Sequence, residues 1–149
     1  FISARKIYEE SFKAKEVRAF VKVNKDQVLL TDNEKAFDEA FKNNKQLTFW
    51  EIIYGDSEIK IAKNFYNHTN RYFFKFLPKS LKLSSEDILI YDEKVAILNF
   101  RGGGTSIVLQ STDFYNNLRE LFNFIWDLLS DSEEVRNDIL INNSPYAVR

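Results

Sequence analysis

The sequence predicts an α/β domain with a mixed sheet of about six strands flanked by helices, and three observations lead to this prediction. Segments of helical and of strand periodicity alternate along the first half of the chain. Three short strand-like segments follow closely in the second half, and a long segment with an apolar stripe comes after them. The alternation favours βαβ units with parallel strands. The close succession of short strands favours an antiparallel meander, and the last segment favours a long closing helix.

The first half carries the alternating elements, assigned from side-chain periodicity of 3.6 or 2. In order, they are a helix over 2–15, a strand over 17–23, a helix ending at Asn43, a strand over 47–54, a helix over 57–66 and a strand over 72–77. Thr31 or Asp32 is expected to cap the second helix. The strand over 47–54 is rich in aromatic and β-branched residues, which predicts burial on both faces.

The second half is predicted to hold the meander, with strands over 87–91, 95–100 and 105–110. Ser111 or Thr112 caps the closing helix, whose broad apolar stripe should pack across the sheet. Residues 131–149 are mostly polar and are expected to form either one more short helix or a segment that docks on a neighbour. We therefore divide the chain into a linker helix at 1–15, one α/β domain at 16–130, and this tail.

Composition excludes several classes of protein. The 21 Lys and Arg residues balance 22 Asp and Glu residues, so there is no basic footprint for a nucleic-acid backbone. The sequence has no cysteine, which excludes disulfides, thiol catalysis and thiolate metal sites and fits a cytoplasmic location. No apolar run approaches the ~20 residues of a membrane-spanning helix. Because the chain opens on Phe1 and has no Met, we expect a piece of a longer protein.

Candidate chemical motifs are few. His68 is the single histidine and lies in a polar turn, so it favours neither a metal site nor Ser–His chemistry. The triplet Gly102, Gly103 and Gly104 precedes a strand and not a helix, which favours a hairpin loop over a phosphate-binding loop. Its backbone N–H groups, beside Arg101 and Thr105, could still hold a small anion. No cofactor and no metal is predicted.

The abundant Phe and Tyr side chains are expected chiefly to pack the core, and some of the aromatic surplus to line a pocket or a subunit interface instead. The candidates are Trp50, Tyr66, Tyr72 and Phe73.

The order and spacing of these segments resemble the C-terminal effector region of TrmB-like transcription regulators, whose fold is similar to half of a phospholipase D domain. The resemblance covers residues 2 to 130 and rests on these segments: Ile7-Tyr8-Glu9-Glu10, Val17-Arg18-Ala19-Phe20, Phe76-Leu77-Pro78, 90–97 (IYDEKVAI) and 121–126 (LFNFIW). Active phospholipase D enzymes carry a His-x-Lys motif ahead of an Asp that starts a turn. Counting back from Asp92 places Ser85 and Asp87 at the histidine and lysine positions, so the resemblance implies that the catalytic site is absent.

The resemblance implies a non-enzymatic regulatory domain, with DNA bound only by an upstream domain, a small-molecule effector and a homodimer. The ligand candidates are Ser85, Asp87, Asp92, Arg101, Gly102, Gly103, Gly104 and Thr105, and the dimerisation candidates are Ile2, Ile7, Tyr8 and Phe12. Two alternatives remain open. One is a phosphodiesterase-like enzyme that uses Asp92, Arg101 and the glycine loop, and the other is a freestanding protein-interaction module.

Overall fold

The computed structural model describes residues 3–22, 30–54 (backbone alone for 30–34), 70–78, 80, 81, 83, 86–99 and 106–129. Over these residues the protein is an α/β structure with a six-stranded mixed sheet and a long helix at its C-terminal end, as predicted. The strands are β1 (Glu16–Lys22), β2 (Thr48–Tyr54), β3 (Tyr72–Phe76), β4 (Asp87–Tyr91), β5 (Lys94–Leu98) and β6 (Ile107–Gln110). The helices are α1 (Ala4–Ser11), α2 (Leu30–Asn43) and α4 (Thr112–Leu128). The expected helix over 57–66 lies outside the described residues.

The strand order is β3-β2-β1-β4-β5-β6. β1, β2 and β3 are parallel, and β4, β5 and β6 form an antiparallel meander, so both halves of the strand prediction are confirmed. The halves join through β1 and β4, which are antiparallel and pair Ala19 with Leu89. Periodicity within a segment carries no information about which strands become neighbours, and so this junction was not predicted.

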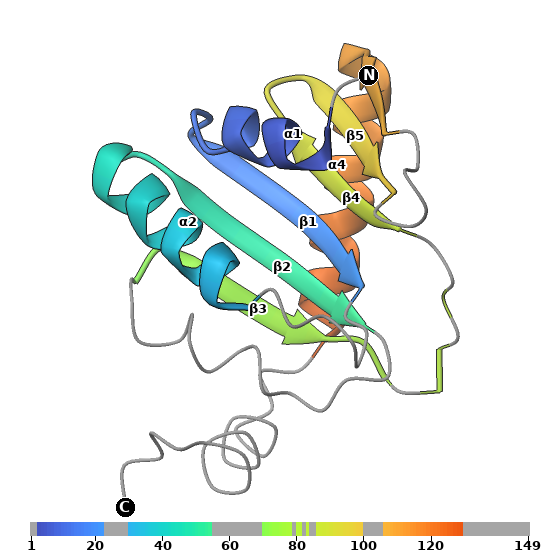
Figure 1. Ribbon diagram of the computed structural model, residues 1–149. Coiled ribbons are helices and arrows are strands. Elements are labelled where there is room, and N and C mark those ends of the chain that lie inside the picture. The colour runs from blue at the N-terminus through green and yellow to red at the C-terminus, as the bar shows by residue number, and fades with distance from the viewer. Residues whose placement is uncertain are drawn as a thin grey trace, which may run out of the picture.

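Two apolar layers cover the two faces of the sheet (Figure 1). Helices α1 and α2 lie over one face, where Ile7 and Phe37 pack against Val17, Phe49 and Leu89 in the larger core cluster. Helix α4 crosses the other face. Its residue Phe122 packs there against Ile52 and Ile90 of the sheet. Because successive side chains of a strand point to opposite faces of the sheet, the strands contribute residues to two separate cores.

Helix α1 is shorter than the predicted 2–15. It begins after Ser3, whose hydroxyl accepts a 3.3 Å hydrogen bond from the backbone N–H of Lys6. It ends at Ser11, and a turn closed by a hydrogen bond from the N–H of Ala14 to the carbonyl oxygen of Ser11 leads into β1. The turn is needed because the chain must reverse within a few residues to place Val17 under its own helix.

Helix α2 begins at Leu30, so Thr31 and Asp32 lie inside its first turn and the prediction that one of them caps it is wrong. At its other end Arg71 supplies the missing donors. Its guanidinium donates to the carbonyl oxygens of Phe41, Asn44 and Leu47 at 2.7, 2.8 and 3.1 Å. These carbonyls lie at and beyond the helix end, where intrahelical partners run out. Arg71 thereby fastens α2 to the start of β3.

The β4–β5 turn consists of Asp92 and Glu93, with Tyr91 paired to Lys94 across it. Both turn residues have positive φ, 44° for Asp92 and 59° for Glu93. Positive φ at both central positions defines the type I′ turn, which matches the twist of the strands it joins. Glu93 also holds the start of α4, because its carbonyl oxygen accepts a hydrogen bond from the N–H of Ser111 at 3.3 Å. Ser111 is the N-cap of α4, as one of the two predicted alternatives had it.

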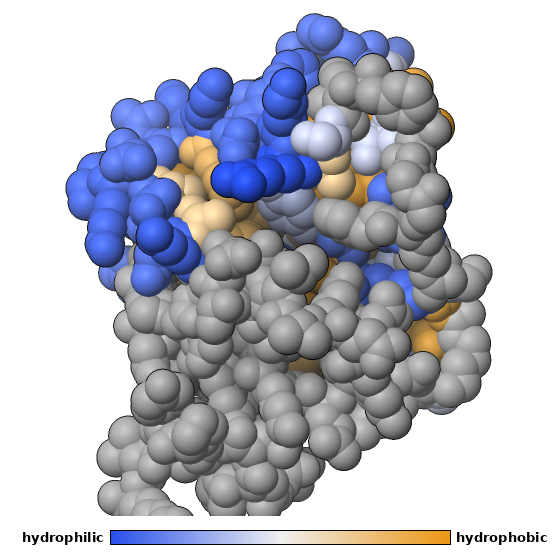
Figure 2. Space-filling view, in the orientation of Figure 1, coloured by the Kyte–Doolittle hydropathy of each residue, from blue (hydrophilic) through white to orange (hydrophobic). Residues whose placement is uncertain are grey.

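The surface over α1 and α2 is largely hydrophilic, with a small hydrophobic patch showing between the two helices (Figure 2). No helix among the described residues is long and apolar enough to cross a membrane.

Candidate functional site

The carboxyl ends of the parallel strands gather the polar groups of greatest interest. β1, β2 and β3 end at Lys22, Tyr54 and Phe76, and β4 begins at Asp87 beside the end of β1. β5 ends opposite Asp87, because Asp87 pairs with Leu98. Open α/β sheets bind ligands outside the carboxyl ends of their strands, at the point where the strand order changes direction. In this sheet that point is the junction of β1 with β4.

Asp87 is buried at this junction, with 6% of its surface exposed. Its Oδ1 accepts a 2.9 Å hydrogen bond from the backbone N–H of Lys22, and its Oδ2 accepts a 3.0 Å hydrogen bond from the Tyr8 hydroxyl. One carboxyl group therefore joins β4, the end of β1 and helix α1. Nearby, the Tyr54 hydroxyl donates to the carbonyl oxygen of Glu86 at 3.0 Å, which ties the end of β2 to the same segment.

A second buried carboxyl group lies under the helices, in the middle of β2. Glu51 is 7% exposed, and its Oε2 accepts a 2.5 Å hydrogen bond from the hydroxyl of Tyr72 on β3. Glu51 occupies a position between Ala19 of β1 and Phe74 of β3 in the strand register. A carboxyl group in such an apolar row is tolerated only when it is hydrogen-bonded or protonated.

Burial is the main cause of the altered acidity of these groups. Desolvation raises the pKa of Glu51 from 4.5 to about 7, against the opposing effect of the Tyr72 hydrogen bond, and the nearby Asp87 raises it further. Desolvation also raises the pKa of Asp87 from 3.8 to about 6, although the hydrogen bonds from Lys22 and Tyr8 lower it. Tyr8 and Tyr72 have pKa values raised well above 10 by burial and by the neighbouring carboxylates, so both remain hydrogen-bond donors.

We name these four residues, Tyr8, Glu51, Tyr72 and Asp87, the carboxyl–tyrosine cluster. Chemically the cluster can take up and release protons near neutral pH. It is poorly suited to acid–base catalysis on a substrate, because both carboxyl groups are more than nine-tenths buried and accept hydrogen bonds from the protein itself. Within it, the Tyr8–Asp87 pair holds α1 against the sheet, and the Tyr72–Glu51 pair joins β3 to β2.

An ion pair fastens α1 near the other end of β4. Lys94, the first residue of β5, donates from Nζ to Oε1 of Glu10 at 2.6 Å. The same Glu10 carboxylate contributes, after burial, to raising the pKa of the Tyr91 hydroxyl to about 12. Helix α1 is thus held by side chains at both ends of β4.

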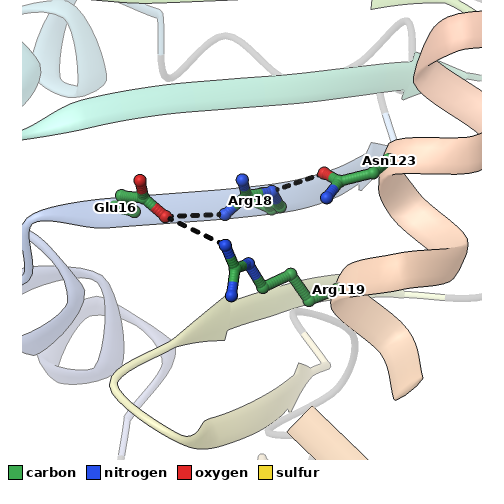
Figure 3. A network of polar contacts seen from close by, with 4 residues as sticks. All are labelled: Glu16, Arg18, Arg119 and Asn123. Carbon is green, nitrogen blue, oxygen red and sulfur yellow. Dashed lines mark hydrogen bonds and ion pairs between the residues drawn. The ribbon is translucent and has the colours of Figure 1, made fainter. Parts of the chain in front are cut away.

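On the opposite face of the sheet, Arg18 organises a polar network beneath α4 (Figure 3). Its Nε donates to Oδ1 of Asn123 at 2.8 Å, and its Nη1 donates to Oε2 of Glu16 at 3.1 Å. The guanidinium also lies 4.7 Å from the centre of the Trp50 ring. Arg119 of α4 reaches toward the same Glu16 carboxylate at 4.0 Å. Because Arg18 is only 8% exposed, this network aligns α4 on β1 and β2.

Lys75 of β3 completes the attachment of α4. Its Nζ donates to the carbonyl oxygens of Trp126 and Leu129, each at 2.9 Å, and lies 4.7 Å from the centre of the Trp126 ring. A cation at the C-terminal end of a helix is favourable for the helix dipole as well as for the unpaired carbonyls.

The ligand residues that the sequence suggested do not form one site. Asp87 and Asp92 lie at opposite ends of β4, on the order of 15 Å apart at ~3.3 Å per residue. Asp92 is an exposed residue of the turn, whereas Asp87 is buried. Ser85, Arg101, Gly102, Gly103, Gly104 and Thr105 lie outside the described residues. The strands that flank the glycine loop, β5 and β6, are antiparallel neighbours, which agrees with the hairpin interpretation.

The dimerisation candidates belong to the core of their own chain. Ile7 has no exposed surface, and Tyr8 and Phe12 pack partly buried against the larger core cluster. Ile7 therefore cannot face a partner while α1 stays on the sheet, and this part of the prediction is corrected. Ile2 lies outside the described residues. Apolar spacing in a short helix does not reveal whether its stripe meets its own sheet or another subunit.

The aromatic candidates have separate roles. Trp50 packs on Arg18 and stacks with Phe73 at a centroid distance of 6.2 Å, and Tyr72 belongs to the carboxyl–tyrosine cluster. Phe73 is 42% exposed. Tyr66 lies outside the described residues, as does His68. In the described part of the chain, no group of three or more His, Cys, Asp or Glu side chains is placed to hold a metal ion.

Sequence reasoning missed Glu51 and the partnership of Tyr8 with Asp87. A usable signal was present for Glu51, since it is the single charged residue in a strand predicted to be buried on both faces. No comparable signal marked Tyr8 and Asp87, which are 79 positions apart.

Comparison with models of protein families, with curated proteins and with solved structures found no match for this chain.

Proposed function

We propose that this chain is a non-catalytic regulatory domain of a TrmB-like transcription regulator, in which an effector at the carboxyl end of the sheet changes the position of α1. The observation that carries the proposal is the Tyr8–Asp87 hydrogen bond. It connects the place where α/β sheets bind ligands to the first helix of the chain, which is where an upstream DNA-binding part would join.

The mechanism is a shift between two positions of α1. A ligand that displaces the Asp87 carboxyl group removes the acceptor that Tyr8 uses. Helix α1 is then held by its apolar packing around Ile7 and by the Glu10–Lys94 ion pair. A ligand shifts such an equilibrium by the difference between its affinities for the two positions, which is typically 1–3 kcal/mol for coupled sites.

The hydrogen bonds that the buried carboxyl groups already accept from the protein support a regulatory function over a catalytic one. A phosphodiesterase of the related fold needs a nucleophile and a cation close to the phosphate. Asp87 stands where the resemblance would place the lysine, and its carboxyl group is engaged by Lys22 and Tyr8. Incubation with bis(4-nitrophenyl) phosphate, with and without Mg²⁺, Mn²⁺ or Zn²⁺, should release no nitrophenol above the rate of buffer alone. If the wild-type chain releases nitrophenol and the D87N variant does not, the result would favour the alternative of a phosphodiesterase-like enzyme.

A direct test of the coupling uses neutral saccharides, inorganic phosphate and nucleotides as probes in a thermal-shift screen of the chain. A probe that raises Tm is then used in hydrogen–deuterium exchange, with amides of α1 as the readout. We expect the probe to change exchange in α1, and the Y8F variant to bind it with the α1 response lost. Binding that leaves exchange in α1 unchanged in the wild-type chain contradicts the proposal.

A further inference from the structure

Helix α4 carries a second apolar stripe that faces away from the sheet. Phe114, Leu121, Phe124 and Leu128 are 38%, 55%, 63% and 70% exposed. Phe114, Leu121 and Leu128 are seven residues apart, and Phe124 lies between the last two, three residues after Leu121. In heptad terms these are successive a positions and one d position, which is the spacing of a helix that pairs with another helix.

The stripe is separate from the side of α4 that the fold itself uses. Phe122 is the buried residue at the centre of the packed side, and Leu118, Ile125 and Trp126 accompany it against the sheet. Among the residues that the structure describes, nothing covers the large apolar side chains of the stripe, and such patches commonly mark interaction sites. Ile107 and Leu109 of the edge strand β6 are also 49% and 42% exposed. They pair with Ile97 and Val95 of β5, a strand that contacts α4.

One flank of the stripe is acidic. Asp113, Glu120 and Asp127 are exposed and are also seven residues apart, each one position before a residue of the apolar stripe. They occupy the heptad g position, where coiled coils place the charges that select a partner. The single basic residue within α4, Arg119, reaches in another direction, toward Glu16 of β1. The stripe is therefore apolar with a negative border along one flank.

We propose that this face of α4 binds an amphipathic helix of a partner protein, with an apolar stripe bordered by lysine or arginine residues. Charge complementarity selects this partner over a second copy of the chain. Antiparallel pairing of two α4 helices would set Glu120 against Glu120 and Asp113 against Asp127, and like charges in these positions disfavour the pair. The same acidic border repels a membrane of anionic lipids.

The test uses the chain and two synthetic peptides of about three heptads, with leucine at a and d and either lysine or glutamate at e and g. Fluorescence anisotropy measures the affinity of each peptide at low and at high salt. We expect the lysine peptide to bind at least about tenfold more tightly than the glutamate peptide, and to weaken as salt rises. Equal affinities for the two peptides, or no binding of the lysine peptide, overturn the proposal.

Variants locate the binding. The double variant L121S/F124S should lower the affinity for the lysine peptide at least about tenfold. The control variant L81S/L83S, which replaces two exposed leucines outside α4, should leave this affinity unchanged. E120K combined with D127K should reverse the preference between the peptides. Sedimentation of the wild-type chain as a dimer that L121S/F124S dissociates assigns the stripe to a second copy and overturns the proposal. The proposal is also overturned if the wild-type chain adsorbs to vesicles that contain phosphatidylglycerol and the L121S/F124S variant does not.

The α4 stripe and the Tyr8–Asp87 pair lie on opposite faces of the sheet. Loss of peptide binding in L121S/F124S and loss of the α1 response in Y8F are therefore independent results, and one proposal can fail while the other holds.

Discussion

The hydroxyl of Tyr8 donates a 3.0 Å hydrogen bond to Oδ2 of Asp87, which joins the first helix of the chain to the strand that connects the two halves of the sheet. The same carboxyl group accepts from the N–H of Lys22 at the end of β1. Because β4 is the antiparallel neighbour of β1, this one residue fastens the parallel half, the meander and α1 together. The stability of that junction is open to direct measurement.

Replacing Tyr8 by phenylalanine removes one donor to a buried carboxyl group and leaves the ring in place. We expect the free energy of unfolding to fall by about 1–3 kcal/mol, since Asp87 loses a partner that it cannot replace with water. Urea denaturation followed by circular dichroism measures the change. Y115F is the matched control, because the Tyr115 hydroxyl makes no hydrogen bond within the described part of the chain and its loss should cost under about 0.5 kcal/mol. Equal losses in the two variants contradict the role given to Tyr8.

The pH dependence of stability should reflect the raised pKa values of Glu51 and Asp87, about 7 and about 6. Between the ordinary values, 4.5 and 3.8, and these raised values, the folded state binds more protons than the unfolded state. The contribution of the two groups is therefore fully present below about pH 4 and is lost as pH rises toward 7. Urea denaturation at several pH values should show the free energy of unfolding decreasing through this range.

E51Q separates Glu51 from the other carboxyl groups. Glutamine imitates the protonated acid, so the variant should be less dependent on pH between 5 and 8, and at pH 8 more stable than the wild-type chain by up to about 3 kcal/mol. E120Q, at an exposed position on α4, should keep the wild-type profile. An E51Q profile parallel to that of the wild-type chain would show that Glu51 is ionised in the folded state throughout the range.

Arg18 should not tolerate replacement by lysine, although the charge is kept. The ammonium group cannot serve Asn123 and Glu16 together in the geometry of a guanidinium, and it stacks less well on Trp50. We expect R18K to lose about 1–3 kcal/mol in the free energy of unfolding, measured with urea. R5K tests the same exchange at a surface pair with Glu9, where the Arg5 side chain is 87% exposed, and should change stability by under about 0.5 kcal/mol. If both variants lose the same amount, the buried network of Arg18 has no special role.

Glycine at position 93 should stabilise the protein. Glu93 has a φ of 59° in a type I′ turn, a conformation that suits glycine and is unfavourable for residues with a Cβ atom. E93G is expected to raise the free energy of unfolding by about 0.5–1 kcal/mol, seen as a higher Tm. The same exchange in the helical backbone of α2, E39G, should instead destabilise by about 1 kcal/mol, because glycine is a poor helix former. A loss of stability in E93G would mean that the contacts of the Glu93 side chain outweigh backbone strain.

Much of the fold could be predicted because local patterns carry it. The strand over 87–91 was predicted with its observed bounds, and Ser111 was one of two expected caps of α4, because a short apolar run and a capping serine are properties of short segments. The prediction that Thr31 or Asp32 caps α2 was wrong, because a residue suited to capping is also tolerated in the first turn of a helix. The candidate site was predicted less well. Asp87 and Asp92 were both predicted to be ligand residues. They form no common site, because the length of β4 separates them.

The sequence by itself determined the fold class, the two kinds of strand connection and the closing helix, since each follows from the spacing of apolar side chains along a few neighbouring residues. Only the tertiary structure decided that β4 pairs with β1, that Ile7 is taken into the core, and that Glu51 is buried beside Tyr72. It also decided which of the apolar residues of α4 meet the sheet and which, such as Leu121 and Phe124, remain exposed. These contacts join residues far apart in the chain, and no periodicity of a single segment records its partner.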